Sequence, residues 1–172
     1  MTSYIFLIGF MGSGKSTIGK LLAHELKYTF IDLDSYIESS HHNSIAELFA
    51  KHGENGFRII EKEALHELQS LQQIVVACGG GAPCFFDNMD WMKSIGEVIF
   101  LHCSPDSLFG RLKYEQAHRP LIRDFEPQAL KQFIIKKLDE RMPFYTQANI
   151  QLFELKDKSA STQWIIETLK ST

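Results

Sequence analysis

The chain has 172 residues, of which 44% are hydrophobic and 23% charged, as in one globular domain with a single core. Its formal net charge of −3 argues against nucleic-acid binding, because no excess of basic residues is present to neutralise a phosphate backbone. No apolar run is long enough to cross a bilayer and no secretion signal is visible, so we expect no membrane partner and a cytoplasmic location.

The first predicted elements are a strand, a loop and a helix. Residues 4–8 form an apolar run that suits one buried strand. Residues 9–16 read G-F-M-G-S-G-K-S, which is the spacing of a phosphate-binding loop. Apolar residues then recur at helical spacing over residues 18–26, so a helix is expected to open at the Lys-Ser end. This context favours the loop over a glycine-rich turn that binds nothing.

The residue types of this loop suit the terminal phosphates of a nucleotide. Its glycines let backbone N–H groups approach an anion, and the helix N-terminus adds unpaired donors. Lys15 can reach the β- and γ-phosphates, and the Ser16 hydroxyl can hold Mg²⁺.

Two carboxylates are expected at the end of the next strand, residues 29–34. Asp32 and Asp34 are two apart and would lie on one side of that strand end, where ligands gather in parallel sheets. The alternative is a solvated strand end, or a cap by Asp34 on a helix at residues 35–38. Asp32 is the better candidate for indirect metal contact, because the apolar strand at residues 74–78 ends without an acidic residue.

Residues 44–71 predict a helix that begins with a capping box and is interrupted at Gly53 and Gly56. Arg58 and Glu61 stand three apart, next to its apolar face. They could pair on the surface, or Arg58 could reach into a cleft as a clamp for a carboxylate or phosphate, held by Glu61.

Three glycines, residues 79–81, follow the strand at residues 74–78. They carry an entropic cost, and we expect their backbone N–H groups to lie close to a ligand; a flexible turn is the alternative. Another strand is predicted at residues 97–103, followed by a helix at residues 107–112.

Residues 113–125 are polar, and Arg119-Pro120 rules out a continuous helix there. We interpret the segment as a flap over the phosphate site, in which Arg119 or Arg123 supplies a cation to the transferring phosphoryl group. The alternative is an ordinary solvated loop.

The remaining predicted elements are a helix at residues 126–142 that Pro143 ends, a strand at 149–153 and a helix at 161–170 with Trp164 in the core. The chain has three cysteines and no C-x-x-C pair, which predicts free buried thiols rather than a metal site. The pair His41-His42 is expected on the exposed surface.

In combination and order, six motifs make the chain similar to the shikimate kinases over essentially its full length. Many P-loop kinases share the first motif, but the whole set is far more specific. The motifs are GFMGSGKST at residues 9–17, DLD at 32–34, GFRxxE at 56–61, GGG at 79–81, RPL at 119–121 and ERxPxY at 140–145.

The resemblance implies a three-layer α/β P-loop fold, a five-stranded parallel sheet between helices, as one domain over residues 1–172. It implies a helical substrate-binding region at about residues 34–62 and a lid at about residues 113–125. It further implies transfer of a phosphoryl group from ATP, with one Mg²⁺ ion, to the 3-hydroxyl of shikimate, and we expect a monomer. A gluconate kinase and a non-catalytic nucleotide-dependent switch are the alternatives.

The resemblance also implies roles for individual residues. Lys15, Asp34 and Arg119 would be catalytic. Ser16 would contact the metal, and Asp32 is the second candidate for metal contact because the strand at residues 74–78 ends without an acidic residue. Substrate contacts fall to Asp34, Arg58, Gly80 and Arg141, between walls made by Phe49 and Phe57. Nucleotide contacts fall to Gly12, Ser13, Gly14, Lys15, Ser16, Thr17, Arg119 and Lys158.

The chain departs from the family pattern at two places. Cys78 stands where a threonine is expected before the glycine triplet. The segment Lys156-Asp157-Lys158 lacks the arginine and proline that often flank the adenine. Lys158 is expected to take over this contact, or Arg111 could stack on the base instead.

Overall fold

The fold is built on a parallel sheet of five strands. The computed structural model describes residues 2–153 and 157–171. The strand order β2-β3-β1-β4-β5 and the parallel pairing of all neighbours confirm the predicted five-stranded sheet. The strands are β1 (Tyr4–Ile8), β2 (Thr29–Asp32), β3 (Ile74–Ala77), β4 (Glu97–His102) and β5 (Ile150–Phe153).

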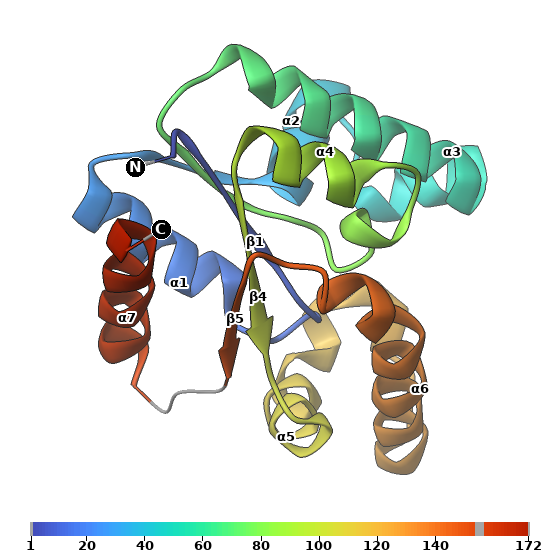
Figure 1. Cartoon of the computed structure of the whole chain (residues 1–172). Helices are drawn as coiled ribbons and strands as arrows, with labels where there is room; N and C mark the ends of the chain where they lie inside the picture. The colour runs from blue at the N-terminus through green and yellow to red at the C-terminus, as the bar shows by residue number, and fades with distance from the viewer. Residues whose placement is uncertain (1, 154–156, 172) are drawn as a thin grey trace.

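Helices cover both faces of this sheet (Figure 1). On β1, Ile5 and Leu7 share one buried cluster with α1 and α7, whereas Phe6 and Ile8 point to the other face and share a cluster with α2 to α6. Alternate side chains of this apolar strand thus pack into two hydrophobic cores, one on each face of the sheet. The helices are α1 (Lys15–Leu26), α2 (Leu33–His41), α3 (Ile45–Glu67), α4 (Asn88–Ile95), α5 (Pro105–Glu115), α6 (Pro127–Tyr145) and α7 (Lys158–Ser171).

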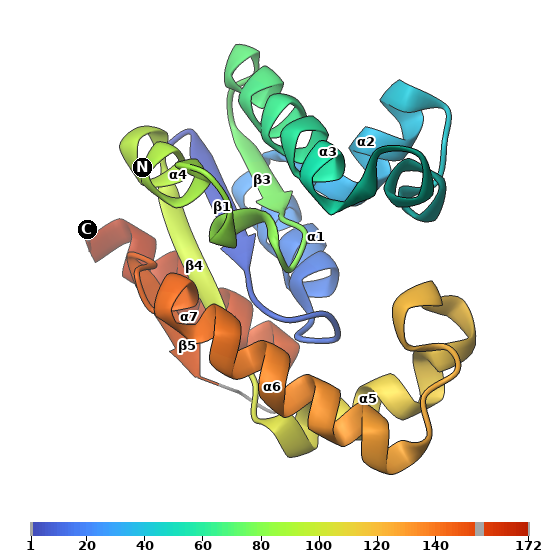
Figure 2. The ribbon, with the colours of Figure 1, turned by 90° about the vertical axis from the view of Figure 1, so that its right-hand side faces the viewer.

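The strand order decides where a ligand can bind. Strands β2 and β3 lie on one side of β1, and β4 and β5 lie on the other, so the strand order reverses direction at β1. In parallel sheets such a switch point opens a crevice at the carboxyl ends of the strands. Figure 2 shows α2 and α3 on one side of this edge and α5 and α6 on the other.

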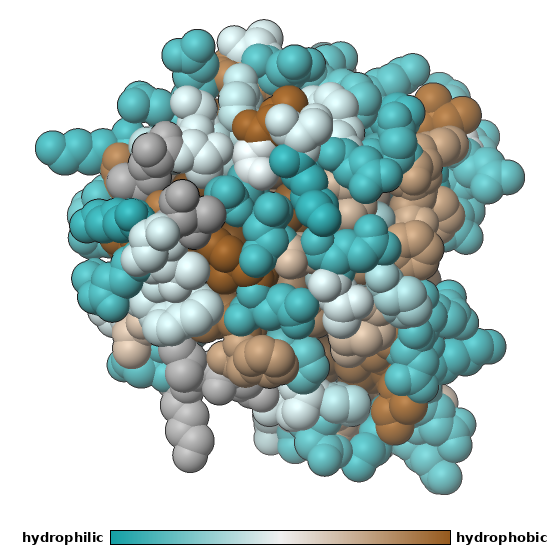
Figure 3. Space-filling model, in the orientation of Figure 1, coloured by the Kyte–Doolittle hydropathy of each residue, from teal (hydrophilic) through white to brown (hydrophobic). Residues whose placement is uncertain are grey.

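None of the helices in the described ranges is both long and apolar enough to span a membrane. In Figure 3 most of the visible surface is hydrophilic, with apolar side chains in small, separate groups.

Several predicted local features are confirmed. Ser44 and Glu47 form a complete capping box at the start of α3. Gly53 interrupts that helix with φ 68° and ψ −178°, as expected, but the break expected at Gly56 was wrong, because Gly56 is helical. The pair His41-His42 is exposed. None of the three cysteines, all of them in the described ranges, forms a disulfide; Cys78 and Cys103 are buried, and Cys84 is half-buried.

The second strand is shorter than predicted, because β2 ends at Asp32 and α2 begins at Leu33. Asp34 therefore lies in the first helical turn rather than at a strand end. The cap of this helix is Asp32, whose carboxylate accepts from the backbone N–H of Ser35 at 3.4 Å. The expectation that Asp34 could be the cap was wrong.

The prediction that Pro143 ends the sixth helix was also wrong, because α6 continues to Tyr145. Tyr145 is completely buried, and its packing outweighs the backbone hydrogen bond that the proline removes. Trp164 is 39% exposed rather than part of the core, because Ile165, Ile166 and Leu169 form the buried stripe of α7. The helix α4 was not predicted.

The segment at residues 113–125 is more structured than a polar flap. Helix α5 runs to Glu115, and two short 3₁₀ helices follow, Gln116–His118 and Pro120–Ile122. Ile122 is completely buried and anchors the segment to the core.

A steric requirement at Gly96 gives a test of this packing. A Cβ on Gly96 would overlap the carbonyl oxygen of Tyr4 in β1, so we expect Gly96→Ala to destabilise the fold by about 2 kcal/mol. This corresponds to a fall in Tm of roughly 4–8 °C in thermal unfolding. Gly110→Ala is the matched control, because the same added atom meets open space inside α5 and should leave Tm unchanged or raise it. Equal Tm values for the two variants would contradict this account.

Candidate active site

The loop between β1 and α1 has the geometry of a phosphate cradle. Gly9, Gly12 and Gly14 have φ angles of 141°, 79° and 96°, a region that side chains disfavour. The Lys15 ammonium donates to the carbonyl oxygens of Gly9 and Phe10, both at 2.9 Å, and so lies over the loop. The unpaired N–H groups at the start of α1 point to the same place.

A cavity of about 390 Å³ opens over this loop. Because side chains from both sides of the crevice reach it, the structure brings most of the predicted site residues together. The predicted residues that line it are Gly12, Gly14, Lys15, Ser16, Thr17, Asp32, Asp34, Gly80, Arg119 and Lys158. Arg123, the alternative to Arg119, is exposed on the surface.

Two features of the cavity suit a metal-bound polyphosphate. Burial lowers the pKa of Lys15 to about 8, although the carboxylate of Asp34 opposes this shift. The Ser16 hydroxyl donates to Oδ2 of Asp32 at 2.7 Å, which sets two oxygen donors side by side at the edge of the loop. Hydroxyl and carboxylate oxygens are suitable ligands for Mg²⁺.

The glycine triplet, residues 79–81, borders the cavity on its other side. A Cβ on Gly79 would lie 2.6 Å from Oε1 of Glu61 and 3.0 Å from Oδ1 of Asp34. None of the three glycines has a positive φ, so space rather than backbone conformation requires them. Close packing by neighbouring side chains therefore accounts for the glycines better than a merely flexible turn does.

The other two glycines of the triplet contact the predicted arginines. A Cβ on Gly80 would lie 3.0 Å from Nη1 of Arg141, and a Cβ on Gly81 would lie 2.6 Å from Nη2 of Arg58. The two guanidinium groups therefore approach the same turn, Arg58 from α3 and Arg141 from α6.

Asp34 is exposed toward the cavity, while protein surrounds the rest of its carboxylate. Burial raises its pKa, and the neighbouring Asp32 carboxylate raises it further. Lys15 and Arg58 oppose this rise. A carboxylate with a raised pKa that faces a phosphate cavity is suited to accept a proton.

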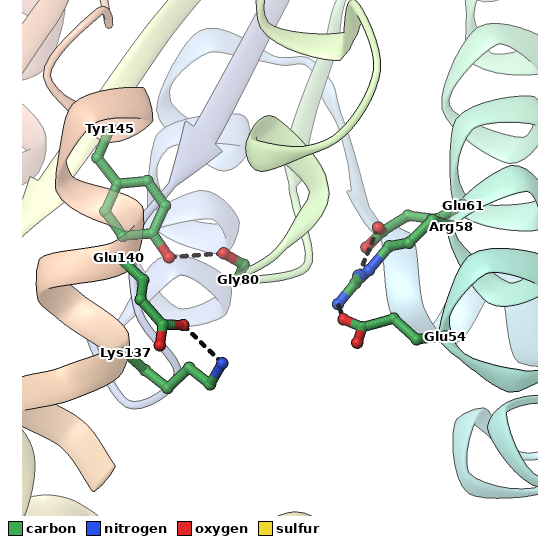
Figure 4. Close-up of polar contacts among 7 residues, drawn as sticks. All are labelled: Glu54, Arg58, Glu61, Gly80, Lys137, Glu140 and Tyr145. Atoms are coloured by element: carbon green, nitrogen blue, oxygen red, sulfur yellow. Dashed lines mark hydrogen bonds and ion pairs between the residues drawn. The ribbon is translucent and has the colours of Figure 1, made fainter. Parts of the chain in front are cut away.

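Arg58 and Glu61 form a buried ion pair rather than a surface one. Their Nη1 and Oε2 atoms are 2.7 Å apart, and the two residues are 7% and 1% exposed. Burial raises the pKa of Glu61, and the Arg58 guanidinium opposes that rise. Glu54 adds a contact to Nη2 at 3.4 Å, so two carboxylates orient one guanidinium toward the cleft (Figure 4).

Aromatic rings surround the same guanidinium. Phe49 and Phe57, the two predicted walls, stack on each other with ring centroids 4.2 Å apart. The guanidinium carbon of Arg58 lies 4.4 Å from the ring centre of Phe85, which the sequence did not single out. Such contacts with ring faces hold a cation in place.

Tyr145 of α6 holds the glycine triplet through a hydrogen bond that was not predicted from the sequence. Its hydroxyl donates to the carbonyl oxygen of Gly80 at 2.6 Å (Figure 4), and burial raises its pKa. Tyr145 follows Arg141 by four residues, so both lie on one face of α6. That spacing in the ERxPxY motif was the available signal.

A smaller hollow of about 80 Å³ adjoins the phosphate loop. Ser13 and Lys158 line it, together with Arg111, His102 and Cys103. Arg111 donates to the carbonyl oxygen of Gly12 at 3.0 Å. Both candidates for the nucleotide base, Lys158 and Arg111, thus lie at this hollow, and Lys156 falls outside the described residues.

Comparisons with known proteins decide the family. The family model described as shikimate kinase matches residues 11–170. The chain belongs to the shikimate kinase family. A shikimate kinase of Bacteroides thetaiotaomicron is 46% identical over 166 residues, which cover 95% of this chain and 92% of that protein.

Solved structures of shikimate kinases have the same fold. A crystal structure of shikimate kinase from Bacteroides thetaiotaomicron has a TM-score of 0.94 at 44% identity and covers 98% of both chains. A shikimate kinase from Acinetobacter baumannii, solved in complex with shikimate, has a TM-score of 0.90 at 32% identity, covering 99% of this chain and 94% of that chain. A gluconokinase from Sinorhizobium meliloti has a TM-score of 0.59 at 19% identity, covers 98% of this chain and 95% of that chain, and shares the fold alone.

The pKa of Lys15 gives a test of the phosphate cradle. Above pH 8 a growing fraction of Lys15 is neutral in the free protein, and phosphates beside it favour the ammonium form. Binding of a non-hydrolysable ATP analogue at pH 9 should therefore be accompanied by uptake of most of one proton by Lys15, and the affinity for the analogue should fall as the pH rises above 8.

Isothermal titration calorimetry in buffers of different ionisation enthalpy measures this proton uptake. Lys15→Arg is the control, because a guanidinium does not titrate in this range. Equal proton uptake by the two proteins would rule out Lys15 as its source.

Proposed function

We propose that the chain transfers the γ-phosphoryl group of ATP to the 3-hydroxyl of shikimate. One observation carries the proposal: Asp34 lines the phosphate cavity and also contacts the glycine triplet that Arg58 and Arg141 approach. A nucleotide phosphate and a small carboxylic acid with hydroxyl groups would thus meet at one carboxylate. Membership of the shikimate kinase family supports ATP and shikimate as the two substrates.

On the nucleotide side, the backbone N–H groups of residues 12–17 are proposed to hold the phosphates. Lys15 and Arg119 are the two cations proposed to stabilise charge on the group in transfer. Lys158 and Arg111 are proposed to hold the base in the smaller hollow.

Ser16 and Asp32 are proposed to hold one Mg²⁺ ion, Ser16 directly and Asp32 by way of water. When bound, the ion would neutralise phosphate charge and help align the γ-phosphoryl group. The hydrogen bond between the two side chains keeps both oxygens at the position where this is needed.

On the acceptor side, Arg58 and Arg141 are proposed to bind the carboxylate, and the Gly80 backbone to contact the ring, between the walls Phe49 and Phe57. Asp34 is proposed to orient the 3-hydroxyl. The hydroxyl oxygen then bonds to the γ-phosphorus as the bond to the bridging oxygen of ADP breaks, and the hydroxyl proton passes to Asp34. Positioning and electrostatics supply most of the acceleration in such a transfer.

Membership of the shikimate kinase family also supports the division of the chain into regions. Residues 34–62 would form the substrate-binding region and residues 113–125 the lid of one domain. A monomer and a cytoplasmic location stay predictions.

An assay of ADP release tests the proposed function. We expect ATP turnover to require shikimate and to stay at the background level with gluconate or without an acceptor. Turnover with gluconate would favour a different small-molecule kinase. Nucleotide binding without turnover in any of the three conditions would favour a switch.

Asp34→Asn tests the proposed role of the carboxylate. The amide keeps the shape of the side chain but cannot accept the proton, so kcat should fall by roughly two orders of magnitude or more. The affinity for an ATP analogue should change little. In the wild type, the acid limb of the pH profile of kcat should lie above the usual carboxyl range, because the pKa of Asp34 is raised and activity needs its ionised form. Near-normal turnover of the variant would remove Asp34 from this role.

A further inference from the structure

Arg119 is held by a carboxylate of the preceding helix. Its Nε and Nη2 atoms both donate to Oε2 of Glu115, at 2.9 and 2.6 Å. Glu115 is the last residue of α5, four positions before Arg119. Nη1 takes part in neither bond, so one end of the guanidinium stays available to another anion.

Contacts within its own segment also brace the backbone that carries Arg119. The side-chain amide of Gln116 donates to the carbonyl oxygens of Ile122 and Phe125, at 2.9 and 2.8 Å. Ile122 is completely buried, and the ring of Phe125 packs edge-on against that of Phe133 at 5.3 Å. The turn from residue 116 to residue 125 is therefore closed on itself and attached to α6.

The pair also lies at the phosphate site rather than on an unrelated surface. Glu115 and Arg119 line the same cavity as Lys15 and Ser16. The charge of Arg119 contributes to the lowered pKa of Lys15, although burial dominates that shift. Two cations thus face one cavity, and a carboxylate fixes the direction of the second.

We propose that Glu115 is the positioning residue of Arg119. It holds the guanidinium by its Nε and Nη2 edge, so that the side chain keeps one direction within residues 113–125 and Nη1 is left for the phosphates. This inference rests on the proposed function, because it assigns Glu115 to the same phosphoryl transfer.

The physical gain is preorganisation. An arginine side chain has many rotamers, and ordering it in the transition state would raise the barrier. A bond to Nε and Nη2 removes most of that freedom beforehand, while the free end can follow the charge that develops on the phosphoryl group.

The proposal predicts an effect on kcat rather than on nucleotide affinity. Glu115 is itself negative, so its removal should not weaken the attraction of the cavity for phosphates. Loss of the fixed direction should lower turnover. We expect Glu115→Ala to reduce kcat by about tenfold, less than the roughly hundredfold loss from a misplacement of 1 Å, with no rise in the KM for ATP.

The experiment measures kcat and the KM for ATP in shikimate-dependent ADP release. Glu115→Gln should fall between Glu115→Ala and the wild type, because its amide oxygen can still accept from Nε and Nη2 but lacks the negative charge that strengthens both bonds. The matched control is Asp106→Asn, which removes an exposed ion pair with Lys131 at the other end of α5 and should keep both constants.

A double-mutant cycle separates positioning from a merely structural role. If Glu115 acts through Arg119, then Arg119→Ala and the double variant with Glu115→Ala should have the same kcat. Multiplied losses in the double variant would overturn the proposal. A kcat of Glu115→Ala within about twofold of the wild type would also overturn the proposal. A kcat above the wild type would overturn it too, because it would mean that Glu115 competes with the phosphates for Arg119.

Failure of the proposed function would look different. In that case the wild type itself would show no shikimate-dependent ADP release. A wild type that is active and a Glu115→Ala variant that is equally active would reject the positioning role alone.

Discussion

The acceptor side of the site depends on the lack of side chains at residues 79–81. Asp34, Glu61, Arg58 and Arg141 come from three helices, and each lies close to where a Cβ of this triplet would be. Two acidic and two basic side chains meet at this turn, and the Arg58 guanidinium offsets part of the repulsion between the two carboxylates. Any side chain in the turn would push one of these groups away from the cleft.

The same turn explains why two substrates can react here. It follows β3, the neighbour of β1, so it lies beside the phosphate-binding loop at the carboxyl edge of the sheet. Asp34 and Lys15 both line the cavity over the phosphate-binding loop; the pKa of Lys15 is lowered and that of Asp34 is raised. Partial burial strengthens the interactions between these charges and the groups around them.

Much of this could be predicted because its signal is local. The spacing of residues 9–16 specifies the cradle, and the capping box at Ser44 and the break at Gly53 follow from adjacent residues. Tertiary packing decided the rest. The sequence left open whether Arg58 is buried, because Phe85 and the glycine turn lie far away along the chain. Pro143 indicated the end of a helix that the burial of Tyr145 extends.

The central claim is that the glycine turn leaves room for the side chains proposed to bind the acceptor. Calorimetric titration of shikimate and of an ATP analogue into Gly81→Ala tests it most directly, because an added Cβ would lie 2.6 Å from the buried Arg58 guanidinium. The account predicts that shikimate binds roughly tenfold more weakly or worse, since the proposed contact of Arg58 with its carboxylate would be displaced, while the analogue keeps its wild-type affinity. Unchanged affinity for shikimate, or an equal loss for both ligands, would contradict it.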